Sequence, residues 1–310
     1  MSHTILVPLD GSALAERALP YAEALARPQG GRLVLVRAVP YLARPATDEH
    51  YPTLVAARAA AAAEARAYLE ALATRLGERG LGASVAVPLE AEADGILAEA
   101  QRQGADCIAM ATHGRGGLGR WVYGSVAEEV LARTRLPILL IRAWLPQGGA
   151  NRLVTHPRVL VPLDGSAAAE GVLPLAAKLA ADLGGSLLLL RAVARPDLQF
   201  APDALLGPLL REELATERAA AEGYLHEVAA RLAPGPMDAP GASPVEAIVR
   251  VGRPGLDTAA AVIETVGQEC GAALVVLTSH RRTGLDRLLL GSVADATLRH
   301  GTLPVILVRP

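Results

Sequence analysis

Apolar positions in the first half of the chain form short continuous runs that alternate with segments of helical spacing. The runs predict five strands, at residues 4–9, 33–39, 85–89, 106–112 and 137–142. Apolar residues spaced three or four positions apart predict helices at residues 12–27, 53–76, 93–103 and 125–134. Strands that are apolar throughout and alternate with helices are typical of a parallel sheet covered on both faces. The pattern therefore predicts a doubly wound α/β domain with a five-stranded, mainly parallel sheet and helices on both faces.

The second half of the chain repeats the first. The sequence ILVPLDGS at residues 5–12 returns as VLVPLDGS at residues 159–166, 154 positions later. Gly124-Ser125 returns as Gly291-Ser292, 167 positions later, so the second copy has 13 additional residues, between Val193 and His280. We therefore predict two tandem domains of this kind, residues 1–145 and 158–310, joined by a linker at 146–157 that contains Pro, Gly and Asn.

Prolines and loops refine this prediction in both copies. Pro20 interrupts the first helical segment and Pro174 interrupts its counterpart, so a kink is expected in each. In the second copy a long helix is expected at about residues 204–232. The Pro- and Gly-containing segment 234–244 that follows is expected to hold much of the additional length.

Composition and charge exclude several classes of protein. The 310 residues are 51% hydrophobic and 20% charged, which is typical of a packed globular protein. The net charge of −2 produces no global field that attracts nucleic acid or an anionic membrane. The first residues lack a signal-peptide pattern, and no apolar run approaches the ~20 residues of a membrane span. With only two cysteines and neither in a CxxC pair, we expect a cytoplasmic protein with free thiols.

The stretch at residues 110–125, MATHGRGGLGRWVYGS, is the strongest candidate for a ligand site. It contains a literal G-x-G-x-x-G, but this follows the fourth predicted strand instead of the first, and the acidic residues downstream fall within a helix. We interpret that match as accidental, and the sequence has no P-loop motif either. A glycine-rich turn followed by a helix start exposes backbone N–H groups, which favours an anion such as phosphate.

A second pattern in this stretch is more specific. Gly114 followed, after nine residues, by Gly124-Ser125 resembles the ATP-binding signature of the universal stress protein family, G-x2-G-x9-G-[ST]. The phrase VPLDGS after the first strand and the last strand, LPILLIR, also resemble that family, and each motif occurs in both copies. The resemblance covers nearly the whole chain and implies an ATP-binding tandem member that acts as a stress sensor or regulator.

The resemblance assigns nucleotide contacts to the ends of three strands and the start of the fourth helix. These are Pro8, Asp10 and the backbone of Ala38 for the adenine, Met110 and Ala111 for the ribose, and Gly114, Gly124, Ser125 and Val126 for the phosphates. It also implies Mg or Mn, held mostly by phosphate oxygens and by Ser125.

Two positions depart from the signature. Its first glycine is Ala111, whose small side chain still permits close approach of a ribose. In the second copy the corresponding positions are Thr278 and Arg281. We therefore expect a second, weaker site formed by Asp164, Ala192, Gly291 and Ser292.

Alternatives remain open at this point. Asp10 and Asp164 also fit as plain turn residues, because Asp-Gly-Ser is favourable turn chemistry. His113 and His280 are interpreted as structural, since no partner acid or nucleophile accompanies them. Rival functions are a family member that acts through protein contacts alone and an enzyme that cleaves the nucleotide α-phosphate bond. Without an acid–base cluster over the phosphates, any ATPase activity is expected to be slow.

The resemblance also makes a prediction about assembly. Universal stress proteins commonly dimerise through their fifth strands, which here correspond to residues 138–142 and 305–309. The two copies are therefore expected to form that pair within one chain, and a homodimer of tandem chains is a further possibility.

Overall fold

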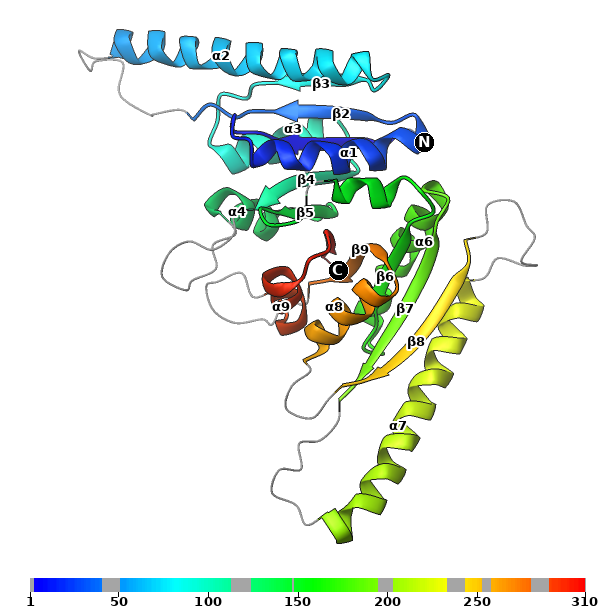
Figure 1. Ribbon diagram of the computed structural model, residues 1–310. Coiled ribbons are helices and arrows are strands. Elements are labelled where there is room, and N and C mark those ends of the chain that lie inside the picture. Colours follow the sequence, from blue (N-terminus) through cyan, green and yellow to red (C-terminus); the bar gives the residue numbers. More distant parts are fainter. Residues whose placement is uncertain are drawn as a thin grey trace. The chain divides into compact units, whose positions relative to one another are not determined.

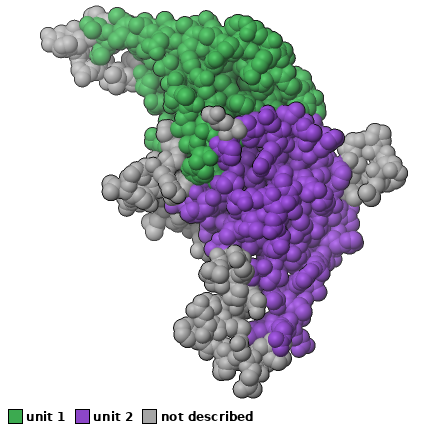
Figure 2. All heavy atoms as spheres, viewed as in Figure 1, with its two compact units in different colours: residues 1–144 green, residues 145–310 purple. Residues whose placement is uncertain are grey.

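The computed structural model describes residues 3–40, 51–112, 124–146, 148–194, 203–232, 243–252, 258–279 and 290–309. The chain divides into two compact units, Met1–Trp144 (unit 1) and Leu145–Pro310 (unit 2), which Figure 2 colours separately. The pairing of the two fifth strands stays a prediction.

Unit 1 is an α/β sandwich with one parallel sheet. Its elements in chain order are β1 (Thr4–Pro8), η1 (Ala15–Ala18), α1 (Leu19–Ala26), η2 (Arg27–Gln29), β2 (Arg32–Val36), α2 (Tyr51–Glu78), β3 (Ala83–Ala86), α3 (Glu92–Arg102), β4 (Cys107–Thr112), α4 (Ser125–Arg133) and β5 (Ile138–Arg142). Within the unit the strands lie in the order β3-β2-β1-β4-β5, and every ladder between them is parallel. The order reverses between β1 and β4, the position at which doubly wound sheets bind ligands.

Unit 2 repeats this arrangement. Its elements are η3 (Gly149–Leu153), β6 (Arg158–Pro162), α5 (Ala167–Glu170), α6 (Leu173–Asp182), β7 (Ser186–Val193), α7 (Asp203–Leu232), β8 (Val245–Val251), α8 (Ala259–Glu269), β9 (Ala272–Thr278), α9 (Ser292–His300) and β10 (Val305–Val308). The strand order β8-β7-β6-β9-β10 is that of unit 1, and its ladders are also parallel. Figure 1 shows the long helix α7 lying along β7 and β8, against which it packs. The predicted fold class is therefore confirmed.

Aliphatic strands buried on both faces form the core of each unit. Leu6, Val34 and Ile108 in unit 1 are fully buried, as are Leu160, Leu188 and Leu274 at the centre of unit 2. Right-handed crossovers place α1 and α2 on one face of the unit 1 sheet and α3 and α4 on the other. The packing of α3 against α4 agrees with this arrangement. Continuous apolar strands were the correct signal, because a sheet covered on both faces leaves no polar side.

The prolines break the first helical segment of each unit into two. In unit 1 the 3-10 turn η1 precedes α1, and Pro20 lies in the first turn of α1. In unit 2, α5 precedes α6, and Pro174 lies in the first turn of α6. A proline lacks the N–H that a helix interior needs, whereas the first turn does not use that group. In place of the expected kink, each segment therefore consists of two separate helical elements, and the proline lies at the start of the second.

The additional residues of unit 2 lie in two places. Leu33 pairs with Ala83 and Leu187 with Val245, so the offset between copies rises from 154 in the second strand to 162 in the third. Helices α3 and α8 begin at Glu92 and Ala259, where the offset is already 167. Most of the extra length therefore separates β7 from β8, and the rest separates β8 from α8. The loop predicted at residues 234–244 lies almost entirely outside the described residues.

Part of the segment predicted as a linker packs into unit 2. Residues Gly149–Leu153 form η3, which contacts β9, and Leu153 is buried. The segment therefore contributes to the core of unit 2 as well as connecting the two units.

Candidate functional site

The turn after the first strand is built identically in both units. The backbone N–H of Ser12 donates to Asp10 Oδ1 at 2.8 Å, and that of Ser166 donates to Asp164 Oδ1 at 2.9 Å. The glycine between them has a positive φ, +89° at Gly11 and +84° at Gly165, which a residue with a Cβ adopts only with strain. Both aspartates therefore accept a hydrogen bond within the turn, and their part in ligand binding stays a prediction. The Asp-Gly-Ser sequence holds the carboxylate at the carboxyl end of the central strand.

A helix start faces the same end of each sheet. Gly291 is the N-cap of α9, and its carbonyl accepts from the N–H of Asp295 at 2.9 Å. Among the described residues, no side chain caps α9 or its counterpart α4, which follows Gly124. The first N–H groups of a helix have no intrahelical partner, and together with the helix dipole they form a site for an anion.

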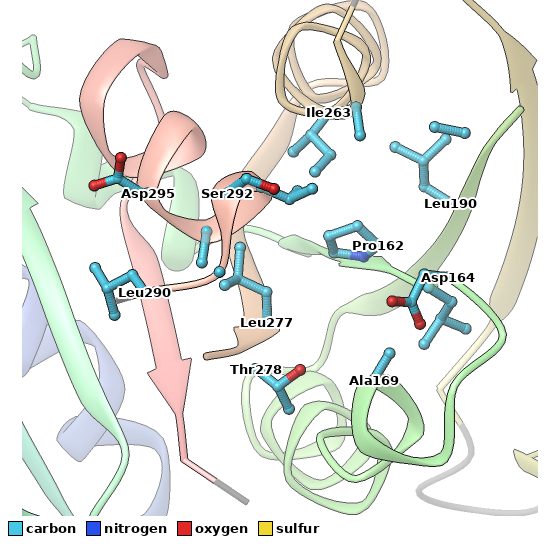
Figure 3. A pocket seen from close by; sticks show the side chains of 16 residues that line it. Pro162, Asp164, Ala169, Leu190, Ile263, Leu277, Thr278, Leu290, Ser292 and Asp295 are labelled. Carbon is cyan, nitrogen blue, oxygen red and sulfur yellow. The ribbon is translucent and has the colours of Figure 1, made fainter. Parts of the chain in front are cut away.

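In unit 2 these parts line one cavity of about 670 Å³ (Figure 3). Its walls come from the ends of β6, β7 and β9, from the first turns of α8 and from the start of α9. All four residues predicted for the second site lie in the lining: Asp164, Ala192, Gly291 and Ser292. The volume lies within the roughly 300–1,000 Å³ typical of small-molecule sites.

The cavity has one apolar end and one polar end. Leu190 and Ile263 lie toward the apolar end, near Pro162, and Asp164 lies beside them (Figure 3). Ser292 points into the cavity from the start of α9, whereas the carboxylate of Asp295 points away from it (Figure 3). Such an arrangement suits a molecule with a flat, largely apolar part and an anionic part.

Thr278 adds a hydroxyl to the lining of the cavity. It is the last residue of β9, is 8% exposed and lines the cavity. In Figure 3 the hydroxyl points into the cavity. A buried hydroxyl in this position is available to a polar group of a ligand.

Titratable side chains are few in the lining. Among the described residues they are Asp164, which accepts hydrogen bonds within its turn, and Asp295, whose Oδ2 lies 2.7 Å from Nε of Arg299. Each carboxylate is already engaged by donors of its own unit. Neither is positioned as a general base over the polar end of the cavity.

In unit 1, the predicted site residues within the described ranges occupy equivalent places. Pro8 ends β1, and Ala38 lies two residues beyond β2. Met110 and Ala111 lie near the carboxyl end of β4, paired with Leu140 and Ile141 of β5. The last group surrounds the start of α4: Gly124, Ser125 and Val126. Gly114 lies outside the described residues, as do His113, His280 and Arg281.

Sequence reasoning missed one wall of the cavity. Ala259 and Ile263 lie one helical turn apart on α8 and close the apolar end. The signal was present in the sequence, since apolar residues four apart at the start of a helix mark the face turned toward the sheet. No chemical feature distinguished that face from an ordinary core contact.

A preformed metal cage is not found in the described part of the chain. The described residues contain no group of three or more His, Cys, Asp or Glu side chains that could hold a metal ion. Both cysteines are free thiols, and desolvation raises the pKa of Cys107 to about 12. Within the described ranges, no helix is both long and apolar enough to span a bilayer.

Comparison with known proteins decides the family. The sequence model of the universal stress protein family matches residues 1–142 and again residues 156–309. The chain belongs to the universal stress protein family. It is a tandem member, with one family domain in each half, as the internal repeat predicted.

Individual universal stress proteins are similar over different parts of the chain. A universal stress protein of Mycobacterium tuberculosis is 30% identical over 208 residues, which span 66% of this chain and 62% of that relative. One from Thermus aquaticus is 36% identical over 147 residues, 46% of this chain and 100% of the relative. A universal stress protein structure from Archaeoglobus fulgidus has a TM-score of 0.66 at 20% identity, covering 100% of this chain and 99% of that chain. The last comparison shows a shared fold across both family domains.

Proposed function

We propose that this tandem universal stress protein binds an adenine nucleotide and acts as a nucleotide-dependent regulator. The unit 2 cavity carries the proposal, because it combines an apolar end beside Asp164 with a helix start at Gly291-Ser292. The base would lie against Leu190, Ile263 and the backbone of Ala192, and the phosphates against the first N–H groups of α9. The equivalent residues of unit 1, together with Gly114, would form the site predicted for the first copy.

A divalent cation is part of this proposal. Mg²⁺ is usually held by phosphate oxygens together with one or two protein ligands. The hydroxyls of Ser125 and Ser292, at the starts of α4 and α9, are the groups we assign to it. The free cysteines suit a reducing compartment, so we also propose a cytoplasmic location.

Hydrolysis of the nucleotide should be slow at most. In the described part of the lining, Asp164 and Asp295 are the titratable residues, and both are bonded within their own unit. The described lining residues therefore offer no general base to activate a water molecule. Rapid turnover would favour the enzyme alternative.

The test is equilibrium binding of a fluorescent ATP analogue to the full chain, with displacement by ATP. We expect displaceable binding, and one site fewer in Ser292→Asp. A carboxylate at the start of α9 favours the helix dipole but repels phosphate, so affinity at unit 2 should fall by at least about 100-fold. Ser125→Asp is the matched variant for unit 1, and Glu212→Gln, on the exposed face of α7, is the control.

Three results would contradict the proposal. They are no binding by the unaltered chain, binding that ATP does not displace, and binding that both Asp variants leave unchanged. The first would favour a protein that acts through protein contacts alone.

A further inference from the structure

A cluster of four polar side chains lies behind the Asp164 turn of unit 2. Tyr224, on α7, donates its hydroxyl to Glu170 Oε1 at 3.0 Å. Arg231, two turns further along α7, contacts Glu170 Oε2 at 2.7 Å. The fourth member, Arg191, comes from β7, directly before Ala192. The cluster therefore links the long helix to α5, which begins immediately after the turn.

Unit 1 contains the same cluster. Tyr68, on α2, donates to Glu16 Oε1 at 2.9 Å, and Arg75 lies 3.8 Å from Glu16 Oε2. Arg37 occupies the place of Arg191, and its guanidinium lies over the Tyr68 ring, 5.7 Å from the centroid. This distance is within the range of a cation–π contact.

The cluster is retained across an insertion. The Glu and strand-end Arg members are 154 positions apart between copies, whereas the Tyr and helix Arg members are 156 apart. The offset of the helix therefore changes by two residues, and the four side chains still lie opposite one another. The contacts therefore occur in both units although the sequence spacing between their residues differs, so simple copying of one segment does not account for them.

The strand-end arginine packs directly against the Asp-Gly-Ser turn. A Cβ built on Gly165 would lie 3.5 Å from Arg191 Nη1, and one built on Gly11 would lie 3.4 Å from Arg37 Nη1. Arg191 Nη1 also donates to the carbonyl of Leu163, at 3.3 Å. The guanidinium thus contacts the backbone on which the aspartate is mounted.

The tyrosines are held in the donor state by their surroundings. Burial and the hydrogen bond to Glu170 raise the pKa of Tyr224 to about 12. Burial and the hydrogen bond to Glu16 likewise raise the pKa of Tyr68. The charge of Asp10 also raises the pKa of Tyr68, so the turn carboxylate and the cluster share one electrostatic neighbourhood. Arg231 lowers the pKa of Glu170, which keeps that carboxylate ionised as an acceptor.

We propose that Arg37 and Arg191 are positioning residues that fix the Asp-Gly-Ser turn and thereby set base selectivity at each crevice. Each arginine comes from the end of the second strand, and its guanidinium lies against the aspartate turn, so it joins the two backbone segments assigned to the base. The Tyr–Glu–Arg part of the cluster orders the long helix against the same turn. This inference rests on the proposed function for its ligand, but the ordering of the turn is independent of any ligand.

The experiment uses the full chain and the variants Arg191→Ala and Arg191→Lys, with the exposed Arg211→Ala as the control. The first readout is amide hydrogen exchange at Ser166, whose N–H bonds Asp164 Oδ1. We expect Arg191→Ala to accelerate this exchange about fivefold, the change that one lost hydrogen bond produces. Arg191→Lys should restore much of the protection, because the ammonium can still donate to the Leu163 carbonyl.

The second readout is the ratio of the dissociation constants for GTP and ATP. Arg191→Ala should reduce this ratio about fivefold while the affinity for inorganic tripolyphosphate stays unchanged. A variant that merely weakened the fold would lower all three affinities together. Arg37→Ala with exchange at Ser12 repeats the measurement in unit 1 and serves if Arg191→Ala does not fold.

Unchanged exchange at Ser166 and an unchanged GTP-to-ATP ratio would overturn the inference. Failure of the proposed function gives a different result, namely no nucleotide binding by the unaltered chain. In that case the exchange rates alone decide whether the arginine orders the turn, and base selectivity is refuted.

Discussion

The two units share a strand order and an Asp-Gly-Ser turn, yet they differ where a helix approaches the end of the second strand. In unit 1, α3 carries Gly95 at the point of contact, and a Cβ there would lie 2.8 Å from Pro88 Cγ and 3.4 Å from Ala38 Cβ. The counterpart in unit 2, 167 positions later, is Val262, a branched residue that is 4% exposed. The helix therefore reaches the strand end closely in unit 1, whereas unit 2 inserts a side chain at that position.

A second difference lies in the polarity of the crevice walls. The lining residues Ala259 and Thr278 of unit 2 correspond to Glu92 and Ala111 of unit 1. Unit 1 thus carries a carboxylate at the start of α3, and unit 2 carries a hydroxyl at the end of β9. Two copies of one motif therefore have differently built crevices, and departure from a glycine signature at Thr278 does not close the cavity in unit 2. The prediction that the second site is weaker stays a prediction.

Of the substitutions considered, replacing Gly95 at the contact of α3 with the end of the second strand has the largest expected effect on stability. Gly95→Ala should lower the free energy of unfolding of unit 1 by about 1–2 kcal/mol. Alanine gains up to about 1 kcal/mol of helix propensity, but overpacking against the rigid proline ring costs about 1–3 kcal/mol. Urea unfolding followed by tryptophan fluorescence reports this, because both tryptophans, Trp121 and Trp144, belong to unit 1.

The matched control is Gly267→Ala in unit 2, whose urea unfolding is followed by circular dichroism because this unit has no tryptophan. A Cβ there would lie 2.5 Å from Leu303 Cδ1, the far end of a flexible side chain. Unit 1 already has Ala100 in the equivalent position, followed by Leu136 as the equivalent leucine. We expect a change within about 0.5 kcal/mol, as helix propensity offsets the repacking. If both variants lose the same free energy of unfolding, the close contact between Gly95 and Pro88 does not determine the effect.

Residues with a periodic or repeated pattern were predictable from sequence. The strands were found because Leu6, Val34 and similar residues are buried on both faces, and the turn was found because Asp-Gly-Ser has its own local hydrogen bond. Strand ends were less accurate, since β2 ends at Val36 and not at residue 39. The N–H groups of Arg37 and Val39 still donate to the carbonyls of Ala86 and Pro88, so hydrogen bonding to the neighbouring segment continues past the end of β2.

The α8 wall of the cavity and the Tyr–Glu–Arg cluster were not predictable in the same way. Ile263 looks like any core residue, and its role depends on where the helix crosses the sheet. Tyr224 and Glu170 are 54 residues apart, and no local pattern joins them. Only the second copy, with Tyr68 and Glu16 in the same relation, offered a hint.

Removing the Thr278 hydroxyl should affect only ligand binding at unit 2. Thr278→Val keeps the shape and β-branching of the side chain but lacks the group that points into the cavity. We expect an affinity for ATP about fivefold lower at unit 2, since one hydrogen bond contributes about 1 kcal/mol. Titration in the Ser125→Asp background isolates unit 2. Ala111→Thr, titrated in the Ser292→Asp background, shows whether a hydroxyl strengthens unit 1. If Thr278→Val binds ATP at unit 2 with unchanged affinity, the ligand does not bond to the hydroxyl.

The smallest expected effect is a difference in stability between variants of the two Tyr–Glu–Arg clusters. Arg231 lies 2.7 Å from Glu170, whereas Arg75 lies 3.8 Å from Glu16, so Arg231→Ala should cost about 0.5–1 kcal/mol at pH 7 and Arg75→Ala less. Because Arg231 lowers the pKa of Glu170 in the folded state, its contribution is present above the unfolded value of about 4.3. It is lost as the pH falls through the folded pKa, where Glu170 becomes protonated. Thermal unfolding followed by circular dichroism between pH 7 and pH 3 should therefore show the Arg231→Ala curve converging on that of the unaltered chain. A constant difference across this range would assign the effect to packing of the arginine stem against α5 and not to its charge.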